Sequence, residues 1–517
     1  MKTTYKFLFL LLISLSIVGC SDLEENPVGV LAPDGFFGAP KDIQTAVDGA
    51  FTHAINEKFW GRKLSIALML RSDMVNLNST ETRRMEHNDL TTLSNNGMIS
   101  EFWLKTYQGI AAANLAIDGA TNVTAPDNVK NPVTAQAHFI RAFYYFHLVR
   151  QFGAVPYIDS PVTDVDATAA ISRTPVSEVY ANIIADLEYA KTWLPNTQTS
   201  RAIPAKSAAI AYLALVHLTM GDDYQLAFNE AKELIDNKAT YNVGLDTNFQ
   251  NLFNAEVIDA SIEPIFALDY NNVEASNNAY DQIAPMLGIR GDERGSGGGW
   301  SVAGPTLEVY TSWDAGDYRR AVSLDEEASI KDASGVYATV PYTNYQRSGH
   351  KFAKNRPYVA KYMRYPGAFA RGSARATSHN YSMMRYAEVL LIAAEAAVEL
   401  NNNGSALVYL NEVRERARRG GATKTGASVD YTFAPSTIPA DHTGTVTVND
   451  VLEERRLELA FEGKRWYDIA RRQLGSTVYS ASGFEGAKPG FTAEDYLMPL
   501  PGDELERNPN LTQNPGY

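Results

Sequence analysis

Residues 204–237 read PAKSAAIAYLALVHLTMGDDYQLAFNEAKELIDN, a stretch whose two alanine-rich apolar segments predict the class of fold. Apolar side chains recur at helical spacing over 209–220 and again over 224–235, which predicts two helices. Ala211, Ala214 and Ala227 stand where small side chains let two helices approach closely. The stretch therefore predicts a closely packed helical pair joined by a short turn.

This pair is similar to a tetratricopeptide-type hairpin. A second pair is predicted at 386–400 and 405–418, joined by the sequence NNNG at 401–404. In such repeats the pairs stack into a right-handed helical scaffold. Further amphipathic patterns predict helices over 41–55, 99–119, 134–152, 176–194, 204–220 and 224–237.

A different pattern occupies the middle of the chain. Between about 241 and 379 the sequence is rich in Gly, Asn, Ser and Tyr without a sustained period, which predicts loops with short strands. We therefore expect a mostly α fold that forms a single domain over 41–517. Its helical scaffold covers about 41–240 and 380–517, and its loop-rich region, about 241–379, is where a ligand is expected to bind.

The N-terminus has the layout of a secretory signal over residues 1–19, with lysines ahead of a short apolar run. The following IVGC at 17–20 resembles a lipobox, and this resemblance implies that Cys20 becomes the acylated N-terminus of the mature protein. Residues 20–40 then form an acidic tether. Its start, SDLEE at 21–25, resembles the signal that sends lipoproteins to the outer face of the outer membrane, and it also suits a solvated tether. We expect a lipid-anchored protein at the cell surface.

Composition excludes some classes of function. A net charge of −14 in 517 residues disfavours nucleic acid as a partner, because a polyanion would be repelled. The single cysteine excludes an intramolecular disulfide. The sequence contains no HExxH motif and no P-loop, so no metal, no cofactor and no catalytic residue is predicted.

Four segments resemble the SusD/RagB family of nutrient-binding outer-membrane lipoproteins, in order along the chain. They are AQAHFIRAFYYFHLVRQFGAVP at 135–156, RYAEVLLIAAEAAVEL and LNEVRERAR within 385–418, VLEERRLELAFEGKRWYDIAR at 451–471, and YLMPLPGDELERNPNLTQNPGY at 496–517. The resemblance implies a SusD-like fold and a non-enzymatic role. Such a protein binds a glycan and delivers it to a SusC-like TonB-dependent transporter.

The third segment also contains carboxylates that could be imagined as a glycosidase pair, namely Glu453, Glu454, Glu458 and Glu462. A structural interpretation is favoured. On one helix, Arg455 can pair with Glu458 and Glu462 with Arg465, each three residues apart. An apolar seam at seven-residue spacing supports it, formed by Leu452, Leu459 and Trp466. The aromatic run at 141–146, and Trp313 with Asp314, Asp317 and Arg319, are likewise interpreted as structural.

Candidate ligand residues are exposed rings with polar neighbours, because aromatic faces pack against sugar C–H groups while amides and charges bind the hydroxyls. Trp300, directly after the glycine run at 295–299, is the first candidate. That run suits a flexible loop and a ligand loop equally well. In the family the pocket lies between the N-terminal helices and the irregular region, so Trp300 is expected to face residues 60–78. The other candidates are Asp73, Asn76, Arg71, Trp60 and Tyr270.

Two hypotheses follow from the sequence. The first is a binding protein for a glycan, or for a peptide or glycoprotein fragment in the same uptake role. The second is a non-catalytic helical-repeat scaffold that assembles surface enzymes. A scaffold would not need Trp300 exposed, so the exposure of that ring distinguishes the two hypotheses.

Overall fold

The computed structural model describes most of the chain after the N-terminal segment. The described ranges are 33–270, 281–289, 299–331, 334–342, 356–367, 377–420, 423–424, 431–432, 435–480 and 484–517. The predicted signal (1–19), Cys20 and the first part of the tether lie outside the described residues. None of the described helices is both long enough and apolar enough to cross a bilayer.

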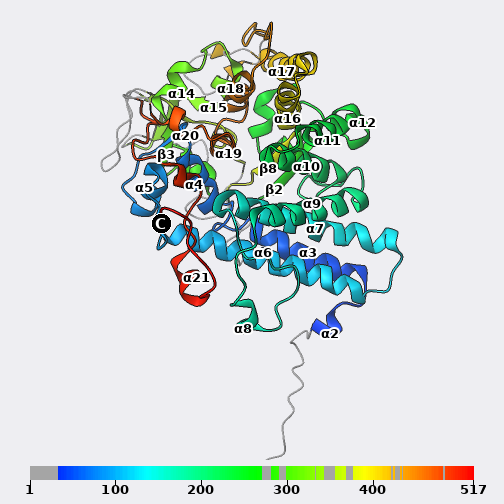
Figure 1. Ribbon diagram of the computed structural model, residues 1–517. Coiled ribbons are helices and arrows are strands. Elements are labelled where there is room, and N and C mark those ends of the chain that lie inside the picture. Colours follow the sequence, from blue (N-terminus) through cyan, green and yellow to red (C-terminus); the bar gives the residue numbers. More distant parts are fainter. Residues whose placement is uncertain are drawn as a thin grey trace, which may run out of the picture.

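A helical scaffold makes up the larger part of the molecule (Figure 1). Its helices are α3 (Pro40–Ala54), α6 (Gly97–Asn122), α7 (Asp127–Phe152), α9 (Val176–Trp193), α10 (Lys206–Met220), α11 (Tyr224–Asp236), α12 (Lys238–Tyr241), α16 (Tyr386–Glu399) and α17 (Asn403–Arg418). In Figure 1 they follow one another from α3 and α6 in the lower part of the view to α17 at the top. The long helices that the sequence predicts are confirmed within a few residues at each end, with α7 beginning earlier than expected.

The two predicted helical pairs form and stack. The α10–α11 turn includes Gly221, at φ 69°, and the side chain of Asp223 caps α11 by accepting the Leu226 N–H at 3.1 Å. In the second pair, Asn402 caps α17 by accepting the Ser405 N–H at 3.2 Å. Helix α11 packs against α16, so the two pairs lie side by side. The predicted tetratricopeptide-like scaffold is therefore confirmed.

The aromatic run of α7 lies in the main core, as predicted. Phe143, Tyr144, Tyr145 and Phe146 are all buried. The Tyr144 hydroxyl donates to the Ala50 carbonyl of α3 at 2.7 Å, so the one polar atom of that ring is satisfied inside the protein. These rings hold the N-terminal helices together and have no surface to offer a ligand.

Short elements make up the irregular region and the segment before α6. The described strands form antiparallel pairs: β1 (Val75–Leu77) with β3 (Ala303–Pro305), β2 (Pro264–Asp269) with β8 (Asn380–Arg385), β4 (Leu324–Asp325) with β7 (Tyr358–Val359), β5 (Glu327–Lys331) with β6 (Tyr337–Pro341), and β9 (Thr423–Lys424) with β10 (Tyr431–Thr432). The short helices are α2 (Pro33–Phe36), α4 (Lys63–Arg71), α5 (Thr82–Asp89), α8 (Val165–Thr168), η1 (Phe249–Phe253), η2 (Ile258–Ala260), α13 (Ile283–Leu287), α14 (Leu307–Ser312) and α15 (Tyr318–Ser323).

The C-terminal part does not form the single helix that the predicted pairing of Arg455 with Glu458 and of Glu462 with Arg465 requires. Helix α18 (Val448–Glu458) ends at Glu458, and α19 (Arg465–Arg471) begins only at Arg465. Between them Phe461 and Gly463 adopt positive φ angles of 64° and 71°, which turn the chain. A Cβ on Gly463 would lie 3.1 Å from the Trp60 ring, so the residue also allows a close approach. The remaining elements are α20 (Gly475–Val478), η5 (Ala493–Tyr496) and α21 (Gly502–Arg507).

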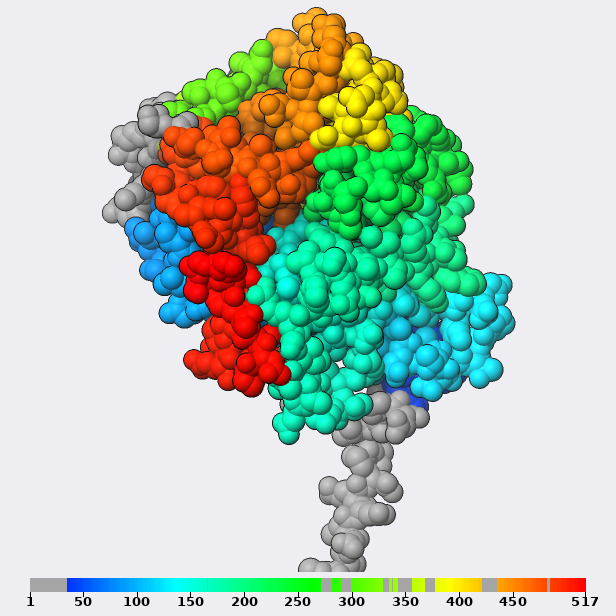
Figure 2. Space-filling model, in the orientation of Figure 1, coloured from blue at the N-terminus to red at the C-terminus, as the bar shows by residue number. Residues whose placement is uncertain are grey.

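The last residues of the chain return to its first half. Asn514 donates to the carbonyls of Phe152 and Met498 at 3.0 and 2.7 Å. Arg173 donates to the Thr512 carbonyl at 3.0 Å. In Figure 2 this red C-terminal segment lies directly beside the teal surface that belongs to the first half of the chain.

Candidate ligand-binding site

The candidate site is built on the β1–β3 ribbon, which joins the N-terminal part to the irregular region. Asn76 lies opposite Gly304 in the antiparallel register. The ribbon extends by one more hydrogen bond, from the Asn78 N–H to the Val302 carbonyl at 2.8 Å. Residues 75–78 therefore lie directly beside the segment that follows Trp300.

A close approach of two backbone segments positions Trp300. The Gly299 N–H donates to the Ile289 carbonyl at 2.9 Å, and the Ser301 N–H donates to the Gly288 carbonyl at 2.9 Å. A Cβ on Gly299 would lie 2.0 Å from the Gly288 carbonyl oxygen, a contact that backbone cannot relieve, so only glycine fits there. The preceding residues of the predicted loop, 295–298, lie outside the described residues.

The Trp300 ring is half-buried and packs one part of its surface against the main core. Asn76 and Asn78 are also partly exposed. A ring in the segment that leads into β3, together with amides on the paired strand, can contact the apolar face of a sugar and bind its hydroxyls. Asn78 was missed in the sequence, although the two-residue period of a strand starting at Val75 would have placed it on the same face as Asn76.

Asp73 takes part in an ion pair that supports the ribbon from inside. Its carboxylate accepts two hydrogen bonds from the Arg465 guanidinium, at 2.9 and 3.0 Å. Burial would raise the pKa of the Asp73 carboxyl, but the charge of Arg465 outweighs burial and lowers it. The Asp73 carbonyl accepts the Thr306 hydroxyl at 3.0 Å. Asp73 thus contacts both the C-terminal part and the residue after β3.

The other three candidates lie inside the protein. Arg71 is fully buried, with its guanidinium 4.4 Å from the centre of the Trp466 ring and donating to the Asp495 carbonyl. Trp60 is 1% exposed and packs against Tyr381, and Tyr270 is 2% exposed. The sequence shows aromatic and charged types but not the depth at which they lie. The structure gives these side chains packing roles instead of a ligand surface.

Three of the four glutamates considered, Glu454, Glu458 and Glu462, belong to a buried ion-pair cluster, whereas Glu453 is exposed and pairs with Arg456 at 2.6 Å. The members of the cluster are Glu263, Arg319, Lys361, Arg385, Arg416, Glu454, Glu458 and Glu462. Glu458 accepts hydrogen bonds from Arg385 at 2.5 Å, from Arg319 at 3.0 Å and from Arg416. Burial alone would raise the pKa of Glu458, but the three guanidinium charges hold it well below its usual range. The structural interpretation of these carboxylates is confirmed.

The specific pairs expected on one helix are wrong. Glu458 pairs with arginines of other elements instead of Arg455, which pairs with Asp468 at 2.9 Å. Glu462 binds Lys361 at 2.8 Å, and Arg465 binds Asp73. The turn between α18 and α19 breaks the spacing of Glu462 and Arg465. Arg455 and Glu458 both lie on α18, but side chains from other elements bind each of them.

The Trp313–Arg319 segment is structural, as predicted. The Asp317 side chain caps α15 by accepting the Arg319 N–H at 2.9 Å and also accepts the Trp313 indole N–H at 3.1 Å. Arg319 is fully buried and reaches Glu454 at 2.6 Å. Across the ranges that the structure describes, no group of three His, Cys, Asp or Glu side chains is arranged to hold a metal ion.

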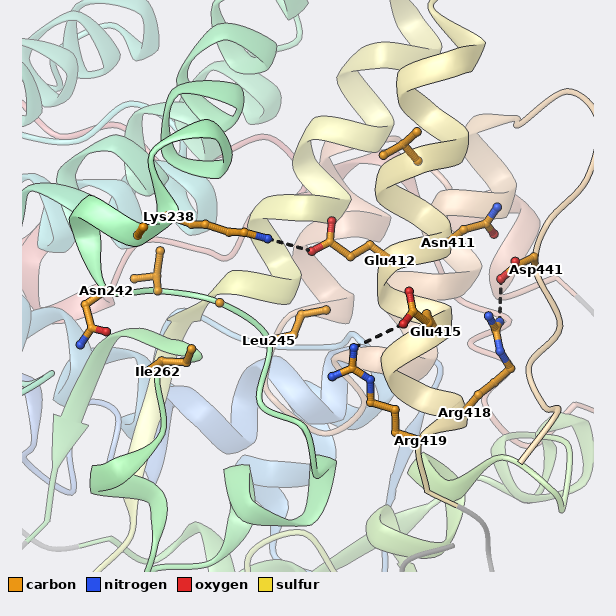
Figure 3. A pocket seen from close by; sticks show the side chains of 14 residues that line it. Lys238, Asn242, Leu245, Ile262, Asn411, Glu412, Glu415, Arg418, Arg419 and Asp441 are labelled. Atoms are coloured by element: carbon orange, nitrogen blue, oxygen red, sulfur yellow. Dashed lines mark hydrogen bonds and ion pairs between the residues drawn. The ribbon is translucent and has the colours of Figure 1, made fainter. Parts of the chain in front are cut away.

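A large surface cavity of about 700 Å³ lies elsewhere, between the end of α12, residues 242–245 and α17 (Figure 3). Its charged side chains pair with one another. Lys238 faces Glu412 at 3.7 Å, and Arg418 binds Asp441 at 2.7 Å (Figure 3). None of the described residues that line it is aromatic. The cavity therefore lacks the ring face that sugar binding calls for, and the β1–β3 surface remains the better candidate.

Two family models match the chain. One, described as "Starch-binding associating with outer membrane", matches residues 42–218, and the other, described as "SusD family", matches residues 325–517. They cover the N-terminal helices and the C-terminal part that Arg465 and Asp73 connect.

Relatives and solved structures agree with these matches. A SusD homolog from Bacteroides thetaiotaomicron superimposes with a TM-score of 0.79 at 19% identity, over 94% of this chain and 98% of that chain. Surface glycan-binding protein A from the same species, solved in complex with laminarihexaose, gives a TM-score of 0.73 at 21% identity, over 92% and 99%. SusD-like protein P2 from Formosa agariphila is 48% identical over 99% of both chains. This near-complete likeness, with the two model matches, shows that the chain belongs to the SusD family.

Proposed function

We propose that this SusD-family protein captures a glycan at the cell surface and delivers it, unchanged, to a SusC-like TonB-dependent transporter. The observation that carries the proposal is the half-buried Trp300 ring, which follows the Gly288–Gly299 contact and lies two residues before Val302, the backbone partner of Asn78. The laminarihexaose complex of a protein with the same fold supports the ligand class. Asn76, Asn78 and Trp300 are assigned to the ligand surface, and Asp73 is assigned to its support.

The burial and pairing of Glu458 and Glu462 support a role in binding without catalysis. A glycosidase needs two carboxyl groups facing one sugar bond. Glu458 and Glu462 are instead buried and fully engaged with arginine and lysine side chains. A substrate therefore cannot reach their carboxylate oxygens, which are already bound by protein side chains.

We further propose a lipid anchor at Cys20, with residues 20–40 as the tether and 41–517 as one binding domain. A multiply acylated cysteine holds a protein firmly on a membrane without a spanning segment. The contact with the transporter is expected to be large, because the ligand must be enclosed between the two proteins.

Isothermal titration of the form that starts after Cys20 tests the ligand surface. Laminarihexaose, maltohexaose and a mixed peptide library are the probes, with Trp300→Ala as the variant. We expect one class of sugar to bind and Trp300→Ala to weaken it at least about tenfold, since losing an aromatic contact costs roughly 1.4 kcal/mol. Trp193→Ala, at another half-buried tryptophan in α9, is the matched control.

Three outcomes would contradict the proposal in different ways. Binding of peptides alone would replace the glycan with a peptide ligand in the same uptake role. Silence with every probe would favour a scaffold for surface enzymes. Sugar binding that survives Trp300→Ala would show that the ligand surface lies elsewhere.

A further inference from the structure

A second amphipathic surface lies on another of the strand pairs, β2–β8. Two cavities of about 220 and 290 Å³ adjoin there and share Ala267 and Asp269 of β2. We name the pair the β2 groove and define it by six side chains, each from a different segment of the chain. They are Phe51, Gln136, Arg201, Asp259, Asp269 and Asn380.

Backbone contacts fix the walls of this groove. The Ala267 N–H donates to the Arg201 carbonyl at 2.9 Å, which holds the α9–α10 connection against β2. On the other side of the strand, Asp269 lies opposite Asn380 in the β2–β8 register. The Asn380 amide donates to the Asp259 carboxylate. The polar groups at this end of the groove are therefore placed by main-chain pairing and not by flexible loops alone.

The α3 side of the groove is apolar. Phe51 is half-buried, and its ring meets Phe266 of the core at 6.2 Å in an edge-on arrangement. Ile55, Ile203 and Leu268 line the cavity around it. Such a surface can pack against the C–H face of a sugar ring.

The opposite end carries donors and acceptors that the protein uses only in part. One Arg201 N–H donates to the Asn242 carbonyl at 2.7 Å, while a guanidinium has five N–H donors. Among the described residues, no ion pair involves Arg201 or Asp269. Burial lowers the pKa of Arg201, and burial together with the charge of Asp259 raises the pKa of Asp269, with no opposite charge among those residues acting on either. These two side chains, with the Asn380 amide, can therefore bind hydroxyl groups of a ligand.

We propose that the β2 groove is a second binding site, separate from Trp300, for a short neutral oligosaccharide. That the ligand is a sugar rests on the proposed function. That the sugar carries no charge follows from the charged side chains of the groove. Asp48, Asp259 and Asp269 outnumber Arg201, so the groove repels uronic acid and sulfated sugars. Two sites on one domain would hold a long polysaccharide more firmly than either site alone.

Titration with laminarihexaose and maltohexaose, together with crystals of the wild-type chain soaked in each sugar, tests this proposal. We expect sugar density in the groove and a weaker binding step that Phe51→Ala reduces at least tenfold. Asp269→Asn, which preserves shape, should weaken the same step severalfold. Phe491→Ala, at another half-buried phenylalanine, is the matched control. An anionic oligosaccharide, tetragalacturonate, should leave the groove empty.

The outcomes separate this proposal from the one about Trp300. Sugar bound at Trp300 with an empty groove would overturn the second site and leave the proposed function standing. Sugar in the groove, with binding unaffected by Trp300→Ala, would support the second site and overturn the first. If neither sugar bound at Trp300 or in the groove, both proposals would be overturned. Tetragalacturonate bound in the groove would overturn the proposal that its ligand is uncharged.

Discussion

Arg465 binds Asp73 through two hydrogen bonds of 2.9 and 3.0 Å, although 392 positions separate them in the sequence. Asp73 lies two residues before β1, and Arg465 begins α19. The strand that carries Asn76 is thus held in place by the C-terminal part of the chain. Because both side chains are largely buried, removing either one would leave the other charge buried without its partner.

Arg465→Met should lower the free energy of unfolding by about 3 kcal/mol, because the Asp73 carboxylate is left buried without its cation. Urea unfolding followed by circular dichroism measures the loss. Arg419→Met, which breaks the exposed pair with Glu415, is the control and should cost no more than about 0.5 kcal/mol. Equal losses in the two variants would mean that breaking the Asp73–Arg465 pair lowers the free energy of unfolding no more than breaking an exposed pair.

Gly299→Ala should abolish the arrangement that presents Trp300. The added Cβ meets the Gly288 carbonyl oxygen at 2.0 Å, and a backbone shift there is expected to cost about 1–3 kcal/mol and to weaken sugar binding. Thermal unfolding and titration measure the two effects. The matched control is Gly49→Ala in α3, where no atom lies within 4 Å, and it should stabilise the protein by about 0.5–1 kcal/mol. An unaffected Gly299→Ala would contradict the proposed close approach.

Acid should destabilise the protein partly through His87. Burial, and then the charge of Arg71, lower the pKa of His87 to about 3, against an ordinary value of 6.5. Between pH 6.5 and 3, His87 is therefore protonated in the unfolded chain but neutral in the folded protein. Stability that is present above pH 6.5 is lost as the pH falls toward 3. In His87→Leu, urea unfolding should show a pH slope smaller by up to about 1.4 kcal/mol per pH unit. An identical slope would show that His87 does not titrate in this way.

Cys20→Ser should release the protein from the membrane. Without a thiol no acyl chain can be attached, and no described helix could replace the anchor. Detergent phase partitioning and incorporation of a labelled fatty acid measure the change. Ser21→Ala, the neighbouring substitution, should leave both unchanged. Labelling that persists in Cys20→Ser would place the lipid on another residue.

The long helices could be predicted because one face of each is apolar at a 3.6-residue period. Helix α4 was not predicted as a helix, because all nine of its residues are buried and its sequence shows no alternation between faces. The turn at Phe461 and Gly463 was also missed, since positive φ angles leave no periodic signal at a phenylalanine. The ion pairs of Glu458 could not be inferred locally because their partners lie on other elements.

The proposed ligand surface could also be predicted only in part. The sequence could suggest that Trp300 lies near residues 60–78, and the β1–β3 register brings the adjacent segments together. The sequence could not show that Asn76 lies at the surface and Arg71 inside the core. Both belong to one polar stretch, in which the chain passes from the buried helix α4 to the strand β1 within five residues. Depth depends on partners such as Trp466, which arrive from the far end of the chain.

The return of the C-terminal segment to Phe152 and Arg173 has a consequence for the export that we propose. A chain with an N-terminal signal crosses the inner membrane in order, so α7 emerges long before Asn514 can contact it. Until translocation ends, the Phe152 carbonyl and the buried Arg71 lack the partners that the final residues supply. Under the export that we propose, these contacts form only after the end of the chain has crossed the membrane, so a chain that stops early would lack them.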